Sequence, residues 1–356
     1  MSVTARRFHV LTDHGDAGNF PDHRIVIRPG WFIRSRVMAL PGMRLLFYVF
    51  FGMKCWWRSV RLPNEGPFVS AGVGHAFVFG FLQWLFGPVL GHRVHFMAPI
   101  LLERKRPGLA GLFDAAKLWV VDKSVDKAIV WGVTDPATYA KEYGVSEENF
   151  QFLLHHITLE KYTFDVGDDG YIFMGGNQGR DFKTFIEAVS TIDFPVFIAT
   201  QAELKQATEW AKPYPHITVR AVTAAEFRQK IARCSIFAEA HPVDFFRTAG
   251  HQTMLNAMWM GKPIVMADKR SAIGYIEDGV DGLVVEAGDI EGMRSALKKL
   301  VDDVELRQKM SQAAQDKVKQ PFYTTLNCMQ RIYNLALKAH FERKGIKLEK
   351  DLIQLY

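Results

Sequence analysis

The sequence predicts an α/β protein of two domains, each built on a doubly wound parallel sheet. Its 356 residues are enough for two domains of ordinary size, and a hydrophobic content of 48% is enough for two cores. Short apolar strands alternate with helical stretches in both halves, which is typical of parallel sheets covered by helices. In each half a glycine turn joins a strand to a helix, and ligands bind at such strand ends.

The first half contains five expected strands, at residues 8–12, 24–28, 67–71, 92–97 and 127–131. A helix, a glycine turn and a last strand follow between residues 139 and 156, and the polar stretch 165–169 marks the passage to the second domain. We therefore expect a first domain over residues 1–160, a second over 161–335, and a C-terminal helix and tail over 336–356.

Residues 67–91 contain no formally charged side chain, so a transmembrane helix has to be considered there. A membrane span needs about 20 consecutive apolar residues. Several glycines, together with His75, Gln83 and Pro88, interrupt this run. We expect a strand, a glycine loop and a buried helix instead.

The second half contains six expected strands, at residues 171–174, 195–199, 217–221, 235–238, 264–267 and 282–285. Between the fourth and fifth of them, an amphipathic helix begins at Gly250 and ends before Gly261. The amides of His251, Gln252 and Thr253 in its first turn have no acceptor within the helix and lie at the positive end of the helix dipole. This pattern predicts an anion site, most simply a phosphate site.

The order and spacing of residues 248–289 resemble the C-terminal domain of the GT4 family of glycosyltransferases. The family pattern is a glycine-led helix with E-x7-E-A-M, followed by G-x-P-V-V and D-G-x-x-G-L-L-V-x-x-G-D. The chain retains Asn256-Ala257-Met258, Gly261-Lys262-Pro263 and residues 278–289 of it. The resemblance implies the GT-B fold, in which two Rossmann-like domains face each other across a cleft and the last helix crosses back to the first domain.

The two glutamates of the family pattern fall on Thr248 and Asn256, so both positions are neutral here. In the family the first glutamate contacts the donor sugar, and the second contacts the ribose hydroxyls of the nucleotide. Asn256 can still bind a hydroxyl as donor or acceptor, whereas Thr248 is a poor substitute for a carboxylate.

A second glycine-rich loop joins a strand to a helix that begins at Asp181. The resemblance places two diphosphate-binding cations around it: after Gly175 the first falls on Gly176 or Asn177, and the second falls on Arg180. The guanidinium of Arg180 suits a diphosphate, because its planar fork can bind two oxygens at once. The alternative is that Arg180 pairs with a surface carboxylate, while Asp181 only caps the helix.

The resemblance also places the nucleotide base beside Val222 and Thr223, after the third strand of the second domain. In the first domain His75 follows a glycine turn and is the candidate acid or base, although a lone histidine is more often structural. No spacing of His, Cys, Asp or Glu suggests a metal site. We therefore expect no metal and no cofactor besides the nucleotide-sugar co-substrate.

The positive charge is concentrated in residues 23–62, where no acidic residue occurs, while the net charge of the chain is +6. Aromatic residues interleave with these cations, as on surfaces that lie against anionic lipid headgroups. The residues expected to face a membrane are Trp31, Arg34, Arg36, Lys54, Trp56, Trp57, Arg58 and Arg61. Alternatively the rings form a core, or the arginines bind a nucleic acid; no nucleic-acid-binding motif accompanies them, so we expect no such partner.

Three widely separated cysteines and the lack of a signal-peptide pattern favour a reducing compartment. We expect a cytoplasmic protein that is peripherally associated with the cytoplasmic face of a membrane. The resemblance implies sugar transfer from a nucleotide diphosphate sugar, with UDP the expected nucleotide and with retention of configuration. The expected acceptor is a membrane lipid or a lipid-linked saccharide, and a soluble acceptor stays open.

The charge that develops on the leaving diphosphate would then be stabilised by Arg180 and the amides of the Gly250 helix. Two other functions remain open. One is a nucleotide-sugar epimerase with the GT-B fold. The other is a degenerate family member that binds a sugar nucleotide or a glycan without turnover.

Overall fold

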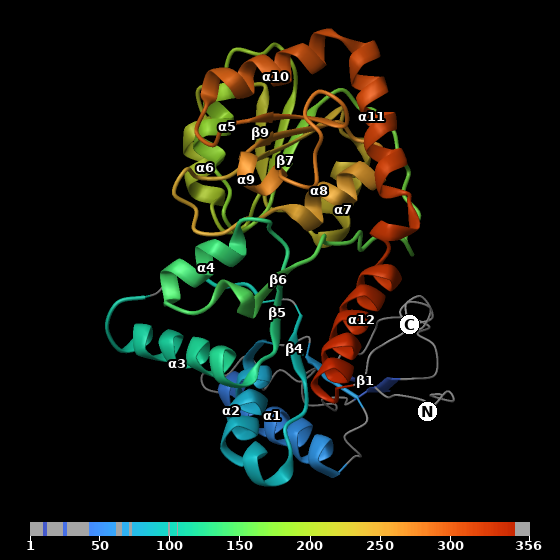
Figure 1. Cartoon of the computed structure of the whole chain (residues 1–356). Coiled ribbons are helices and arrows are strands. Elements are labelled where there is room, and N and C mark those ends of the chain that lie inside the picture. Colours follow the sequence, from blue (N-terminus) through green and yellow to red (C-terminus); the bar gives the residue numbers. More distant parts are fainter. Residues whose placement is uncertain are drawn as a thin grey trace. The chain divides into compact units, whose positions relative to one another are not determined.

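The chain divides into two compact units, Met1–Leu153 with Leu326–Tyr356 and Leu154–Thr325. The computed structural model describes residues 10–12, 24–26, 43–61, 66–70, 73–98, 100–104 and 106–345. Each unit contains a parallel sheet of six strands with helices packed against it (Figure 1). The predicted α/β class with two Rossmann-like domains is confirmed.

The sheet of the first domain has the strand order β2-β1-β3-β4-β5-β6. Its strands are β1 (Val10–Thr12), β2 (Arg24–Val26), β3 (Phe68–Ser70), β4 (His95–Met97), β5 (Lys127–Val130) and β6 (Phe150–Phe152). Its helices are α1 (Met43–Arg61), α2 (Val73–Leu90), α3 (Gly108–Ser124), α4 (Asp135–Tyr143) and α12 (Thr325–Arg343).

The C-terminal helix α12 completes the core of the first domain. Its residues Ile332 and Ala336 are fully buried in a cluster with Val69, Phe96 and Ile129 of the sheet. Phe68, on the opposite face of β3, packs instead with Phe51 and Phe79 of α1 and α2. The predicted return of the last helix to the first domain is therefore observed.

The domain boundaries differ from the predicted residues 160 and 335. The first unit ends at Leu153, because the Leu153 amide still donates to the Val130 carbonyl of β5 (3.0 Å). Two residues later the His155 amide donates to the Tyr275 hydroxyl of the second domain (2.9 Å). At the other end, α12 begins at Thr325 rather than near 336, because its apolar face continues without a break from Cys328 to Phe341.

The sheet of the second domain has the order β12-β11-β10-β7-β8-β9. Its strands are β7 (Ile172–Gly175), β8 (Val196–Ala199), β9 (Ile217–Arg220), β10 (Ile236–Ala240), β11 (Ile264–Ala267) and β12 (Gly282–Val285), so all six expected strands are present. Its helices are α5 (Phe182–Val189), α6 (Leu204–Ala211), α7 (Ala224–Arg233), α8 (His251–Trp259), α9 (Lys269–Ala272), α10 (Ile290–Asp302) and α11 (Val304–Val318).

Side chains alternate between the two faces of this sheet, as the period of a strand requires. Ile236, Ala238 and Ala240 of β10 join the core formed with α5, α6 and α10. Phe237 lies on the other face, with its ring tilted against that of Phe173 at a centroid distance of 6.2 Å. Glu239 shares this second face, so the alternation directs a carboxylate into the protein at the end of a buried strand.

Helix α2 is less buried than the sequence predicts. Helices α1 and α3 pack against it, but Trp84, Leu85 and Val89 remain 40%, 48% and 86% exposed. The expectation of a buried helix was therefore wrong for this face of α2. Among the described residues, none of the helices combines the length and the apolar character that a membrane span requires.

Candidate functional site

The second sheet changes direction of winding between β7 and β10. From β7 the chain proceeds outward to β8 and β9, and it then returns to add β10 on the other side of β7. The loops that follow these two strands leave the same edge of the sheet. In open α/β sheets ligands bind at such a switch point. The two motifs singled out in the sequence, after β7 and after β10, are brought together here.

In the loop after β7, the side chain of Arg180 turns inward. Its Nε donates to the Gly175 carbonyl (3.1 Å) and its Nη1 to the Gln178 carbonyl (3.1 Å), so the guanidinium holds the loop closed. Gly176 has φ of 143°, and a Cβ there would lie 2.8 Å from Arg180 Nε. Asp181 caps α5 by accepting the Thr184 amide (3.0 Å). The sequence correctly predicted the cap, and the glycine is needed for the close approach of the guanidinium.

The partner of Arg180 is Glu239 of β10, a residue that the sequence analysis did not identify. Arg180 Nη2 lies 2.8 Å from Glu239 Oε1, and the two side chains are 6% and 0% exposed. Burial acts to raise the pKa of Glu239, but the charge of Arg180 and the contact with His241 outweigh it and hold the pKa below its usual value. Within the described part of the chain, Glu239 Oε2 has no hydrogen-bond partner. The carboxylate that pairs with Arg180 is thus buried, not at the surface as the alternative supposed.

His241 extends this ionic network to the next strand. Its Nε2 lies 3.0 Å from Glu239 Oε1, and its Nδ1 lies 3.3 Å from Asp268 Oδ2 at the end of β11. Asp268 also accepts the Ser271 hydroxyl (2.8 Å), which in turn accepts the Ala249 amide (3.1 Å). Burial raises the pKa of Asp268, but the hydrogen bond and charge of His241 and the Ser271 hydroxyl lower it to about 2. The chain of contacts links β10 and β11 to the residue before Gly250.

Helix α8 begins directly above this network. Gly250 has φ of 83°, and a Cβ on it would lie 1.7 Å from Glu239 Oε1, so only glycine fits. The first-turn amides of His251, Gln252 and Thr253 have no intrahelical acceptor. The His251 ring is buried, donates from Nε2 to the Ser271 carbonyl (3.1 Å) and stacks on Tyr275. Burial lowers the pKa of His251 to about 4, so this ring is neutral near pH 7. The backbone, not the imidazole, therefore remains for a ligand.

The positions of the two family glutamates face different surroundings. Thr248 is buried, 3% exposed. Asn256 uses both ends of its amide on the segment that enters the domain: its Oδ1 accepts the Thr158 amide (3.0 Å) and its Nδ2 donates to the Thr158 hydroxyl (3.0 Å). Gln252 Nε2 donates to the same hydroxyl (3.1 Å). Thr158 is thus a further residue at the site that sequence reasoning missed.

Asn177 lies in the loop that follows β7, and Val222 and Thr223 lie in the loop that follows β9. The Asn177 side-chain oxygen accepts the Gln201 amide (2.8 Å), and Gln201 Nε2 donates to the Val222 carbonyl (3.2 Å). Thr223 caps α7 by accepting the Glu226 amide (3.2 Å). The three predicted residues therefore belong to one connected set of loops at the carboxyl ends of β7, β8 and β9.

The predicted acid or base of the first domain, His75, lies in the first turn of α2. It is 5% exposed and packs edge-on against Phe51 of α1, with a centroid distance of 4.6 Å. Helix α2 follows β3, and the first sheet changes direction of winding between β1 and β3. His75 is therefore at the switch point of its own sheet, with its ring packed into the core.

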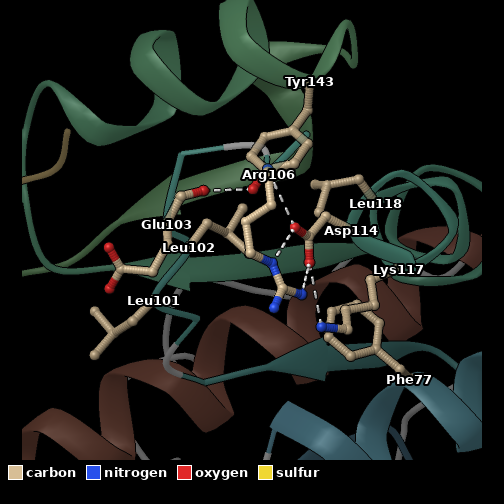
Figure 2. Close-up of a pocket in the computed structure, with 9 residues that line it drawn as sticks. All are labelled: Phe77, Leu101, Leu102, Glu103, Arg106, Asp114, Lys117, Leu118 and Tyr143. Atoms are coloured by element: carbon tan, nitrogen blue, oxygen red, sulfur yellow. Dashed lines mark hydrogen bonds and ion pairs between the residues drawn. The ribbon is translucent and has the colours of Figure 1, made fainter. Parts of the chain in front are cut away.

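The first domain contains a pocket of about 250 Å³ between α2, α3, α4 and the loop that follows β4. Figure 2 shows Arg106 and Lys117 converging on Asp114, with the apolar side chains of Phe77 and Leu118 among the residues that line the pocket. Arg106 donates to both oxygens of Asp114 (2.8 Å each), and Lys117 Nζ lies 3.5 Å from Asp114 Oδ1. The hydrogen bond from Arg106 lowers the pKa of Asp114 to about 2. The pocket is therefore lined by apolar side chains together with charged groups that hold one another in place.

The other predicted residues can be placed only in part. Lys54, Trp57, Arg58 and Arg61 are exposed on α1, whereas Trp56 is partly buried against the core of the first domain. Trp31, Arg34 and Arg36 lie outside the described residues. Within the described segments, no group of three His, Cys, Asp or Glu side chains is arranged to hold a metal ion.

Comparisons with known proteins agree with this architecture. Residues 252–317, which include α8 and the strands that follow it, match the family model of Glycosyl transferases group 1. No curated protein sequence matches the chain.

Three solved structures of similar fold have sequence identities below 15%. A variant of S. aureus TarM, in complex with fondaparinux, α-GlcNAc-glycerol and UDP, has a TM-score of 0.61 at 14% identity over 82% of this chain. Anabaena Alr3699/HepE in complex with UDP and glucose has a TM-score of 0.61 at 13% identity, covering 92% of this chain and 98% of its own. Sucrose-phosphate synthase from Thermosynechococcus elongatus has a TM-score of 0.62 at 12% identity, covering 89% of this chain and 84% of its own. The chain spans only 58% of the length of TarM.

The fold is therefore that of the GT-B glycosyltransferases. Within that fold, residues 252–317 of the second domain are similar to the group 1 glycosyltransferases.

Proposed function

We propose that the protein transfers a sugar from a UDP-sugar to a lipid or to a lipid-linked saccharide, with retention of configuration. The observation that carries the proposal is the start of α8 at the switch point of the second sheet. There Gly250 permits a close backbone approach, and three first-turn amides accompany the positive end of the helix dipole. The UDP complexes of TarM and HepE, which share this fold, support the choice of nucleotide.

The diphosphate would be held mainly by backbone amides. As the sugar–phosphate bond breaks, negative charge grows on the leaving diphosphate, and preorganised donors stabilise that charge without reorganising. Arg180 adds a cation beside these amides, but Glu239 compensates its charge at 2.8 Å. In this scheme Arg180 shapes the loop of Gly175, Gly176 and Asn177 as much as it attracts the phosphate.

The sugar and the ribose would be recognised by neutral groups. Thr248 and Asn256 replace the carboxylates of the family pattern, and Asn256 is already bonded to Thr158. A ribose hydroxyl that binds Asn256 has to share the amide with Thr158 or displace it. The base would lie beside Val222 and Thr223, where Gln201 in the loop after β8 donates a hydrogen bond to the Val222 carbonyl in the loop after β9.

For the acceptor, the first domain offers a charged surface and a pocket. Lys54, Arg58 and Arg61 lie exposed on α1, which contains no acidic residue, and such a surface is attracted to anionic lipid headgroups. The pocket in Figure 2 is large enough for one sugar ring and carries Arg106, Asp114 and Lys117 to bind hydroxyls. We therefore favour a lipid-linked saccharide over diacylglycerol, whose single hydroxyl would leave most of these groups unused.

In this proposal the protein is peripherally associated with the cytoplasmic face of a membrane. Cys55, Cys234 and Cys328 all lie in buried positions, and this use of cysteine as a core residue supports a reducing compartment.

One observation favours a second candidate, a protein that binds the sugar nucleotide without turnover. The charge of Arg180 is compensated by Glu239, and Asn256 is already hydrogen-bonded to Thr158. An epimerase would require an acid and a base beside the bound sugar, and incubation with the donor alone separates it from a transferase.

The proposal is tested by measuring UDP release from a panel of UDP-sugars, with and without lipid extract. Release that requires lipid supports the transferase. Conversion of the sugar without an acceptor would indicate the epimerase, and binding without release would indicate the non-catalytic protein.

The phosphate site is tested by comparing Gly250→Ala with Gly279→Ala. Both glycines have a left-handed backbone, φ of 83° and 79°, but only Gly250 would direct its Cβ at Glu239. We expect UDP affinity to fall at least tenfold in the first variant and to stay unchanged in the second. Gln252→Pro removes one first-turn amide where proline is tolerated, and it should weaken UDP by about tenfold. Unchanged UDP affinity in Gln252→Pro would exclude these amides from the phosphate site.

A further inference from the structure

The exposed surface of α2 is unusual for a protein in water. The helix contains no Asp, Glu, Lys or Arg. Six large apolar side chains between residues 81 and 90 are at least 40% exposed: Phe81, Trp84, Leu85, Phe86, Val89 and Leu90. Single exposed apolar residues are common, but a contiguous group of this size marks a surface that another apolar phase covers.

Ring contacts join this surface across three helices. Trp84 of α2 packs edge-on against Trp119 of α3 at a centroid distance of 4.6 Å, and Phe86 packs against Trp56 of α1 at 5.2 Å. On α1 four of the exposed apolar residues fall at helical spacing: Leu46, Phe50, Met53 and Trp57. We call these residues of α1, the six of α2 and Trp119 the apolar face of the first domain.

The charges around the apolar face indicate what covers it. Helices α1 and α2 contain no carboxylate, and the described cations near the end of α1 are Lys54, Arg58 and Arg61. The Arg61 guanidinium stacks 4.3 Å above the Trp57 ring. Tryptophan beside arginine, next to aliphatic residues on two helices without carboxylates, matches the boundary between lipid headgroups and acyl chains. A second protein would be expected to meet a polar rim of both charge signs.

We propose that the apolar face inserts into the interfacial region of an anionic bilayer, with α2 supplying the penetrating side chains. Val89 and Leu90, at the end of α2, are the deepest anchors, and Arg58 and Arg61 pair with lipid phosphates. This deepens the proposed function, since it rests on a membrane-borne acceptor. It goes beyond attraction by basic residues, because apolar insertion does not depend on salt.

The test measures binding of the full chain to vesicles of phosphatidylcholine with phosphatidylglycerol, at low salt and at about 0.5 M salt, where charge attraction is screened beyond a few Å. The wild type should remain bound at high salt. The double variant Leu85→Glu/Val89→Glu should lose at least tenfold in high-salt partitioning, because carboxylates resist transfer from water. The control Val280→Glu/Val304→Glu adds the same charges at exposed valines of the second domain and should bind like the wild type.

Depth of insertion is read from quenching by brominated lipids. Trp84→Phe should lose a large part of the quenching, whereas Trp131→Phe, at a core position that is 6% exposed, should lose little. High-salt binding of Leu85→Glu/Val89→Glu equal to the wild type would overturn the proposal. So would a wild-type dimer in solution that this variant converts to a monomer, because a second copy would then cover the face.

UDP affinity separates this inference from the proposed function. The α2 variant should retain wild-type UDP affinity, because the proposed donor site lies in the second domain, and an unchanged urea unfolding transition shows that it is folded. If the α2 variant no longer binds vesicles but still releases UDP when it transfers the sugar to a water-soluble acceptor, the result would support insertion. If the protein inserts normally but transfers no sugar, the proposal of membrane insertion would stand and the proposed transferase function would be wrong.

Discussion

The two domains place charge and apolar surface in opposite ways. In the second domain, Arg180, Glu239, His241 and Asp268 bury their polar groups under the start of α8. In the first domain, α2 and its neighbours expose large apolar rings. Both arrangements are unfavourable for an isolated domain in water, since burying charges costs desolvation and exposing rings forfeits the hydrophobic gain. Such costs persist where a site or an interface requires them.

The difference shows how far each domain is organised by its own internal contacts. The buried network of the second domain fixes two loops and one helix start before any ligand arrives, which is the preorganisation that charge stabilisation requires. The described side chains of the apolar face of the first domain are instead joined by ring contacts and remain exposed.

The largest expected effect comes from breaking the buried pair. Glu239→Ala leaves the guanidinium of Arg180 buried without its carboxylate, and we expect the free energy of unfolding to fall by about 3–5 kcal/mol. The control is Glu226→Ala, which breaks the exposed Arg220–Glu226 pair and should cost less than about 1 kcal/mol. Urea unfolding measures both. Equal effects would mean that the network of the second domain is not a structural centre.

The second largest expected effect is a fall in the free energy of unfolding of the second domain on acidification. Burial lowers the pKa of His251 to about 4 and that of His155 to about 3. Because an unfolded histidine titrates near 6.5, the unfolded state binds more protons below that pH, and stability falls as pH falls. Between pH 7 and pH 5 each ring should contribute a loss of about 2 kcal/mol.

The variant His251→Gln isolates one of these contributions, since burial also lowers the pKa of His340 in the first domain to about 4. Its loss of unfolding free energy between pH 7 and pH 5 should be about 2 kcal/mol smaller than that of the wild type. An identical pH dependence in the variant would show that His251 is not held neutral by burial.

The smallest expected effect concerns the pocket of the first domain. Lys117→Ala removes one donor from the pocket, and we expect KM for a lipid-linked saccharide to rise about fivefold, or about 1 kcal/mol. KM for the UDP-sugar should not change, because the donor site belongs to the second domain. Lys123→Ala on the same helix, paired with Asp122 outside the pocket, is the control. An unchanged acceptor KM would remove the pocket from the acceptor site.

Local patterns made much of the fold predictable. The strands of the second sheet were recognised because each is a short apolar run between turns. The start of α8 was recognised because Gly250 precedes an amphipathic helix. The helix caps of Thr223 and Asp181 follow from the residues themselves. The predicted boundary near residue 160 missed Leu153, because a single hydrogen bond to Val130 decides where the first sheet ends.

Long-range pairings were not predictable in this way. Glu239 reads as an ordinary residue inside an apolar run, and nothing near it in the sequence indicates Arg180 as its partner. The contact between Asn256 and Thr158 likewise joins segments that are distant along the chain. The exposure of α2 depends on which of its faces α1 and α3 cover, and a helix with apolar residues on all sides and no charged residue has no periodicity that reveals this.

The sequence by itself determined the two α/β domains, the glycine-led phosphate-type helix and the excess of cations without carboxylates in residues 23–62. Each of these depends on local periodicity, backbone freedom or composition. Only the tertiary structure decided that Arg180 pairs inward with Glu239, that Asn256 binds Thr158 and that α2 presents an apolar face. These features depend on which elements become neighbours in space, and packing selects those neighbours through contacts that sequence spacing does not encode.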